Sequence, residues 1–90
     1  MDFTIVQRAG MTQLEFSALA GVSRVTTNMW CRGKMSPHKY IRARIAALLH
    51  ALESAVADAQ LPIEEGIPKA ERVARIKERV RTAAHRPATN

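Results

Sequence analysis

The 90-residue chain has few cysteines and aromatic residues, and it lacks a long apolar run. Its single cysteine, Cys31, cannot close an intramolecular disulfide, whereas a small secreted domain normally needs several cysteines. The longest uninterrupted apolar run, residues 45–49, is too short to span a membrane, and the first residues do not resemble a signal peptide. We therefore expect a cytoplasmic protein with no membrane-spanning segment.

Patterns typical of enzymes and metal sites are also missing. The histidines, His38, His50 and His85, lie far apart and form no metal-binding motif. The chain has no Gly-rich phosphate loop and no Ser nucleophile elbow, and Glu64 and Glu65 lie in a predicted linker without a partner. We therefore expect no metal, no cofactor and no enzymatic activity.

Positive charge is in excess. Fourteen Lys and Arg residues against eight Asp and Glu residues give a net charge of +6. This balance favours an anionic partner, either nucleic acid or an acidic membrane surface. The hydrophobic fraction of 47% predicts a folded core rather than a disordered chain, and the length leaves room for one such core.

Helix start and stop signals recur along the chain, whereas the alternating pattern of strands is missing. A short first helix is expected to end at Gly10, where glycine permits a left-handed conformation. Thr12 and Glu15 have the spacing of a capping box, which predicts the start of a second helix that stops at Gly21. These signals predict an all-α fold of four to five helices.

Two further starts follow. Ser23 is expected to cap a third helix over residues 24–32, and Ser36 followed by Pro37 predicts the start of a fourth. The fourth helix is expected to be long, because apolar residues recur at three- and four-residue steps as far as Ala59. These residues are Ile41, Ile45, Leu48, Leu49, Leu52 and Val56.

Prolines then bracket a linker over residues 61–68, between a head at residues 1–60 and a final helix at residues 69–86. We expect the head to stay folded without the final helix. The apolar stripe of that helix is too short for an independent coiled coil, so it must pack on another surface. The stripe consists of Val73, Ile76, Val80 and Ala83.

The final helix is also basic. Residues 69–86 contain seven basic and two acidic side chains, a net charge of +5. Three interpretations of this run stay open: a solvated helix face, additional contact with phosphates, or a partner-binding element. The helix has no aromatic side chain for stacking on bases or for anchoring at a membrane surface, so we expect no membrane partner.

The most informative segment is residues 13–33, where residues 20–23 join two short helices with the turn length of a helix-turn-helix. Gly21 permits the positive φ that such a turn requires, and the small Ser17 allows the helices to approach closely. Trp30 is expected to anchor the third helix to the core.

The stretch from Met11 to Lys34 resembles the Cro/lambda-repressor-like (Xre-type) family of DNA-binding proteins. The positions that agree in register are Gln13, residues 20–23, Trp30 and Gly33. Two positions depart from the family pattern: Ser17 stands in place of alanine, and Thr27 in place of Val or Ile. We expect the Thr27 hydroxyl to bond to a carbonyl one turn earlier.

The resemblance implies that the helix at residues 24–32 enters the major groove while the preceding helix crosses the DNA backbone. Arg24 suits guanine, Asn28 suits adenine and Val25 suits the thymine methyl group. The residues implied to face the groove are Ser23, Arg24, Val25 and Asn28, with Met29 at its margin.

The resemblance also implies contacts outside the groove. Gln13 would touch a phosphate or brace Arg24. Arg32 and Lys34, just past the third helix, would hold phosphates.

We therefore expect a phage-type transcriptional regulator, in the simplest case a repressor, that binds double-stranded DNA. One such module reads few base pairs, so we expect a homodimer on an inverted-repeat operator, paired through the long fourth helix and the final apolar stripe. Two alternatives remain. One is an antitoxin-like regulator whose tail, from about Leu61, binds a toxin; the other is a non-DNA interaction module that uses the cationic final helix.

Overall fold

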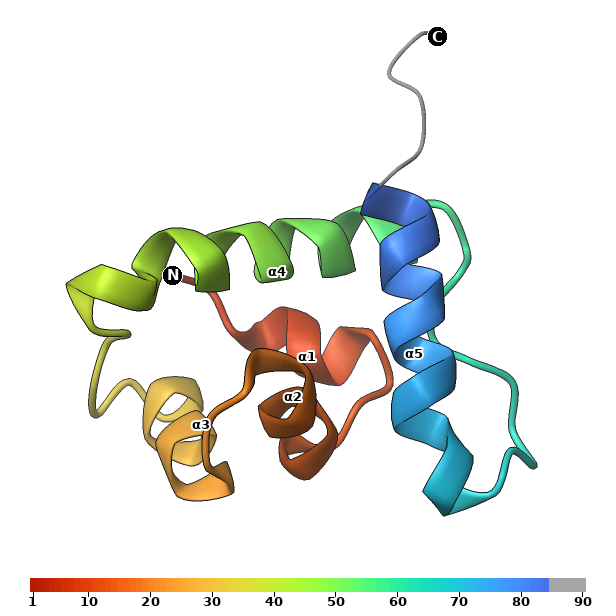
Figure 1. The fold of residues 1–90 in the computed structure, drawn as a ribbon, viewed down its shortest axis with the longest axis horizontal. Helices are drawn as coiled ribbons and strands as arrows, with labels where there is room; N and C mark the ends of the chain where they lie inside the picture. Colours follow the sequence, from red (N-terminus) through yellow and green to blue (C-terminus); the bar gives the residue numbers. More distant parts are fainter. Residues whose placement is uncertain (85–90) are drawn as a thin grey trace, which may run out of the picture.

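The computed structural model describes the backbone of residues 1–84 and the side chains of residues 1–82. Residues 1–84 form five helices and no strand, which confirms the all-α fold (Figure 1). The helices are α1 (Thr4–Arg8), α2 (Gln13–Ala20), α3 (Arg24–Cys31), α4 (Lys39–Ala57) and α5 (Lys69–Ala84). None of these helices is long and apolar enough to cross a membrane. The Ala83 side chain and residues 85–86 of the predicted last helix lie outside the described residues.

The predicted start and stop signals of α2 and α3 are confirmed. Thr12 Oγ1 accepts the backbone N–H of Glu15 at 3.1 Å, and the Glu15 carboxylate accepts the N–H of Thr12 at 2.9 Å. Ser23 Oγ accepts the N–H of Thr26 at 3.0 Å. Gly21 ends α2 with a φ of +71°. Both helices therefore begin where a side chain satisfies an otherwise free amide.

The predicted start of α4 is wrong by two residues. The helix begins at Lys39, and its N-cap is His38, whose Nδ1 accepts the N–H of Tyr40 at 3.2 Å. The predicted signal, Ser36 followed by Pro37, lies outside the helix. Pro37 is fully buried, so the loop carries this ring into the interior before the helix can start.

A single core holds the helices together, and α4 lies across α1 (Figure 1). The Phe3 ring meets the Phe16 ring edge-on, with 6.2 Å between centroids, and the tilted Trp30 ring lies 5.6 Å away. Trp30 is 4% exposed, which confirms that it anchors α3. The long α4 contributes Ile45, Leu49, Leu52 and Ala55 to this core.

Helix α5 packs against α4 and α2 of the same chain (Figure 1). Ile76 is fully buried and Val80 is 9% exposed. In the connecting segment, Leu61 and Ile63 are 3% and 6% exposed. Ile76 and Val80 of the apolar stripe therefore pack within the chain, and residues 61–68 contribute side chains to the core as well as joining two helices.

The expectation that Glu64 lacks a partner is wrong. Arg79 of α5 donates from Nη2 to Glu64 Oε1 at 2.6 Å and from Nη1 to the carbonyl of Gln60 at 2.9 Å. The connecting segment folds back along α5, so a carboxylate that looks isolated in the sequence meets a cation 15 residues later.

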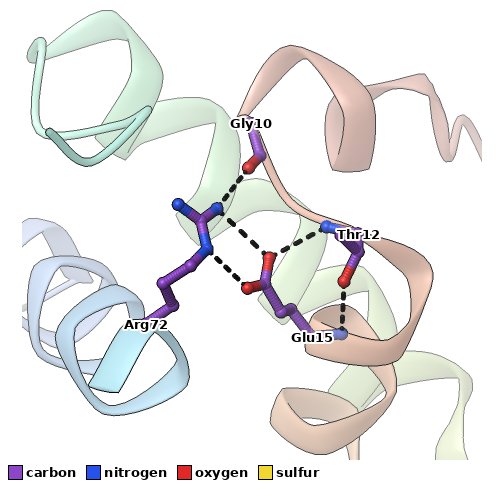
Figure 2. Close-up of polar contacts among 4 residues, drawn as sticks. All are labelled: Gly10, Thr12, Glu15 and Arg72. Carbon is purple, nitrogen blue, oxygen red and sulfur yellow. Dashed lines mark hydrogen bonds and ion pairs between the residues drawn. The ribbon is translucent and has the colours of Figure 1, made fainter. Parts of the chain in front are cut away.

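Arg72 ties α5 to the start of α2 (Figure 2). Its Nε donates to Glu15 Oε2 at 2.6 Å, and its Nη2 donates to Glu15 Oε1 at 3.3 Å and to the carbonyl of Gly10 at 2.8 Å. The Glu15 side chain is 8% exposed and also completes the capping box with Thr12. One carboxylate therefore starts α2 and joins it to α5.

This contact predicts an acid-dependent stability. The hydrogen bond from Arg72, helped by the amide of Thr12, lowers the pKa of Glu15 from its ordinary value of 4.5, although burial opposes the shift. A carboxyl group whose pKa is lower in the folded state stabilises the fold above its unfolded pKa, and this stabilisation is lost as pH falls through the folded pKa. Urea denaturation between about pH 6 and about pH 3 should show the free energy of unfolding falling below pH 4.5.

The matched control is Glu15→Gln, which keeps the capping acceptor but removes the titrating group. Arg79 also lowers the pKa of Glu64, so Glu64 adds to the pH dependence of stability in both proteins. The difference between wild type and variant therefore gives the contribution of Glu15 alone. An identical decline with pH in the two proteins would show that Glu15 contributes nothing to it.

Candidate nucleic-acid interface

Helix α2, residues 21–23 and helix α3 form a helix, a three-residue turn and a second helix that packs on the first. A Cβ on Gly21 would meet no atom within 4 Å, so its positive φ, and not lack of space, explains the glycine. Ser17 is 4% exposed, and its hydroxyl donates to the carbonyl of Leu14 at 2.7 Å. Ser17 therefore replaces an alanine without leaving an unpaired hydroxyl, and partly buried Val22 packs against the core at the turn.

The two faces of α3 have different surroundings. Thr27 and Trp30 are buried on the inner face. Arg24 and Val25 are exposed on the outer face, and 68% of Val25 is accessible to solvent. The inner face of α3 thus packs on the core, and the outer side chains of its first turn are exposed to solvent.

The structure places the eight predicted contact residues in two groups. Ser23, Arg24, Val25, Arg32 and Lys34 are exposed, and Gln13, Asn28 and Met29 are partly buried. The Ser23 hydroxyl is already engaged, because it accepts the N–H of Thr26 and donates to Thr26 Oγ1 at 2.9 Å. Ser23 therefore acts first as a helix cap.

Of the two roles predicted for Gln13, the phosphate contact stays a prediction, and the brace involves another residue than Arg24. Gln13 Oε1 accepts a hydrogen bond from Nδ2 of Asn28 at 3.0 Å, so that Gln13 braces Asn28 instead of Arg24. The cause is the packing of α2 on α3, which sets the first residue of α2 beside the middle of α3. A side-chain amide has two N–H donors and an acceptor oxygen, so Asn28 retains hydrogen-bonding capacity beyond this bond.

The expected bond of the Thr27 hydroxyl is wrong. Thr27 Oγ1 is buried and has no hydrogen-bond partner among the described residues, and the same holds for Trp30 Nε1. Thr27 occupies a fully buried position, where its methyl group packs as an apolar side chain would. Burying an unpaired hydroxyl costs on the order of 1–3 kcal/mol.

Helix α4 carries further cations and an exposed aromatic ring that were not among the predicted contact residues. Arg44 of α4 donates from Nη1 to the carbonyl of Ala20, at the end of α2, at 2.6 Å. At the start of α4, Tyr40 is 82% exposed, with Lys39 Nζ 5.3 Å from its ring centre and the His38 ring 4.9 Å away. The sequence signal that could have identified Tyr40 is an aromatic residue flanked by the basic residues Lys39 and Arg42.

The remaining reactive group near this face is Cys31. It is partly buried, and burial raises the pKa of its thiol, so the thiol is protonated at neutral pH and a poor nucleophile. Within the part of the chain that the structure describes, no three His, Cys, Asp or Glu side chains gather into a metal-binding group. Comparisons of the chain with protein-family models, with curated proteins and with solved structures found no match.

Proposed function

We propose that the chain is a sequence-specific DNA-binding protein of the Cro/lambda-repressor-like kind, which reads the major groove with α3. The observation that carries the proposal is the exposure of Arg24 and Val25 on a helix whose opposite face is anchored by Trp30. An exposed valine gives folding no advantage, whereas beside an arginine it suits a thymine methyl group next to guanine. The net charge of +6 supports an anionic partner.

Each contact residue has a distinct part in this proposal. Arg24 makes a bidentate contact with guanine, and Asn28, oriented by Gln13, pairs with adenine. Arg32 and Lys34 contact phosphates and hold the helix in register without selecting a base. The proposed activity therefore separates into base recognition on α3 and backbone contacts just past it.

The proposed regulation is repression by occupancy in the cytoplasm, by a homodimer on an inverted repeat, because one α3 reads too few base pairs. Ile76 and Val80 are buried within the chain, so the apolar stripe of α5 is not the pairing surface in this proposal. The same burial weakens the antitoxin alternative, because no large hydrophobic side chain that the structure describes between residues 61 and 82 is exposed. Sedimentation of the protein with and without its operator measures the stoichiometry.

Two alanine variants test the proposal after the operator has been selected from random DNA. Arg24→Ala should relax the preference at one base pair per half-site and cost about 1–3 kcal/mol there. Lys34→Ala should weaken binding to all sequences alike and reduce the slope of log affinity against log salt by about 0.9 per protomer, or about 1.8 for the homodimer. Titrations on the operator and on single-base variants separate the two effects. An unchanged base preference in Arg24→Ala, or wild-type binding that ignores salt, would contradict the proposal.

A further inference from the structure

A groove of about 440 Å³ lies between α2 and the first turns of α3 and α5. Its lining is apolar at Leu14, Val22 and Val73, and cationic at Arg24 and Lys69. Glu15 also lines the groove, but its carboxylate is ion-paired with Arg72. Leu14 is 55% exposed, whereas Phe16, two residues later on the same helix, is fully buried. The groove thus continues from the face of α3 onto a helix that is not part of the helix-turn-helix.

The position of Lys69 beside this face is set by the fold. Arg72, one turn later on α5, is held by Glu15 of α2 and by the carbonyl of Gly10 (Figure 2). In Figure 1 the start of α5 lies on the same side of α4 as α2 and α3, with α2 between α3 and α5. The first turn of α5 therefore cannot move independently of α2 without breaking the Arg72 contacts.

The charges in this region leave Lys69 available. Arg72 is paired with Glu15, whereas Lys69 is exposed on the border of the groove. Glu71 follows Lys69 by two residues, which puts it on the opposite side of the helix at about 100° per residue. The groove therefore combines apolar side chains with positive charge at its border, which matches the deoxyribose carbons and the charged phosphates of a DNA strand.

We propose that this groove seats the sugar–phosphate backbone of the DNA whose bases α3 reads, with Lys69 contacting a phosphate and Leu14 contacting deoxyribose carbons. The inference rests on the proposed function and adds a third element, α5, to the DNA contact. The basic C-terminal helix then has two parts: its buried face stabilises the fold, and its first turn lengthens the contact along the strand.

The test compares Lys69→Gln with Lys77→Gln, a matched loss of one exposed charge on the same helix, about 12 Å further along. Operator affinity is measured at about 50 to 200 mM salt. Lys69→Gln should lower the salt slope by about 0.9 per protomer, or about 1.8 for the homodimer, so its deficit in operator affinity relative to wild type shrinks about 12-fold over that range. Lys77→Gln should keep the wild-type slope, and both variants should keep the wild-type base preference.

Leu14→Glu, at an exposed position, gives a second readout, because it sets a carboxylate among the phosphates. It should weaken operator binding by about tenfold or more while the urea unfolding curve stays that of wild type. If the two lysine variants show equal slopes, or if Leu14→Glu binds like wild type, the proposal for the groove is overturned while the function of α3 stands. A wild-type protein without salt-dependent DNA binding overturns both.

Discussion

Removal of residues 61–90 is expected to leave a 1–60 fragment that no longer unfolds in a cooperative transition. In the part of the removed segment whose side chains the structure describes, residues 61–82, four apolar side chains are buried: Leu61, Ile63, Ile76 and Val80. At about 1.5–3 kcal/mol for each buried aliphatic side chain, the loss is about 6 kcal/mol or more. A domain of this size has a total stability of about 5–15 kcal/mol, so the loss is of the same size as the whole stability. This expectation reverses the one drawn from sequence, in which the head folds alone.

A pair of neighbouring variants in the full chain controls for the truncation. Ile76→Asp puts a charge at a fully buried position, whereas Lys77→Asp changes an exposed one. Ile76→Asp should reproduce most of the loss, and Lys77→Asp should stay within about 0.5 kcal/mol of wild type. Urea denaturation followed by circular dichroism measures both. If the 1–60 fragment has the same urea unfolding transition as the full chain, α5 does not contribute to the stability of the core.

Replacement of Arg72 by alanine is expected to lower the free energy of unfolding by about 3 kcal/mol. The variant leaves the Glu15 carboxylate, 8% exposed, without its cation, and it removes the donor to the carbonyl of Gly10. Breaking a buried ion pair by removing one partner costs about 3–5 kcal/mol, and the 24% exposure of Arg72 puts this case near the lower end.

The control is Arg8→Ala, because Arg8 also pairs with a glutamate, Glu53, at 2.7 Å, but with side chains 49% and 45% exposed. An exposed pair is worth about 0–1 kcal/mol, so this variant should unfold almost like wild type. The double variant Arg72→Ala with Glu15→Gln should regain more than half of the loss, since glutamine needs no cation and still completes the capping box. Equal losses in Arg72→Ala and Arg8→Ala would show that burial of Glu15 does not matter.

The sequence by itself determined the features whose partners lie within one helical turn. The capping box of Thr12 and Glu15 and the Ser23 cap each join residues three apart, so local spacing was enough to predict them. The positive φ of Gly21 follows from the same local chemistry. Helical periodicity likewise predicted that Ile45, Leu49 and Leu52 of α4 face inward, because it depends only on position along one helix. The predicted end of this helix is wrong, because α4 ends at Ala57 and Ala59 is exposed with a φ of +60°. The all-α fold and the exposed first turn of α3 follow from these local features.

Only the tertiary structure decided which elements meet. Gln13 meets Asn28 across 15 positions, and Arg72 reaches Glu15 across 57, so neither pairing has a signal in local spacing. The displaced start of α4 has the same origin, because the burial of Pro37 depends on how the loop packs. Periodicity identifies an apolar face but not the surface that covers it, since many pairings of helices bury similar apolar areas. In the structure α5 packs on α2 and α4, and this packing brings Lys69 and Arg24 to the same groove.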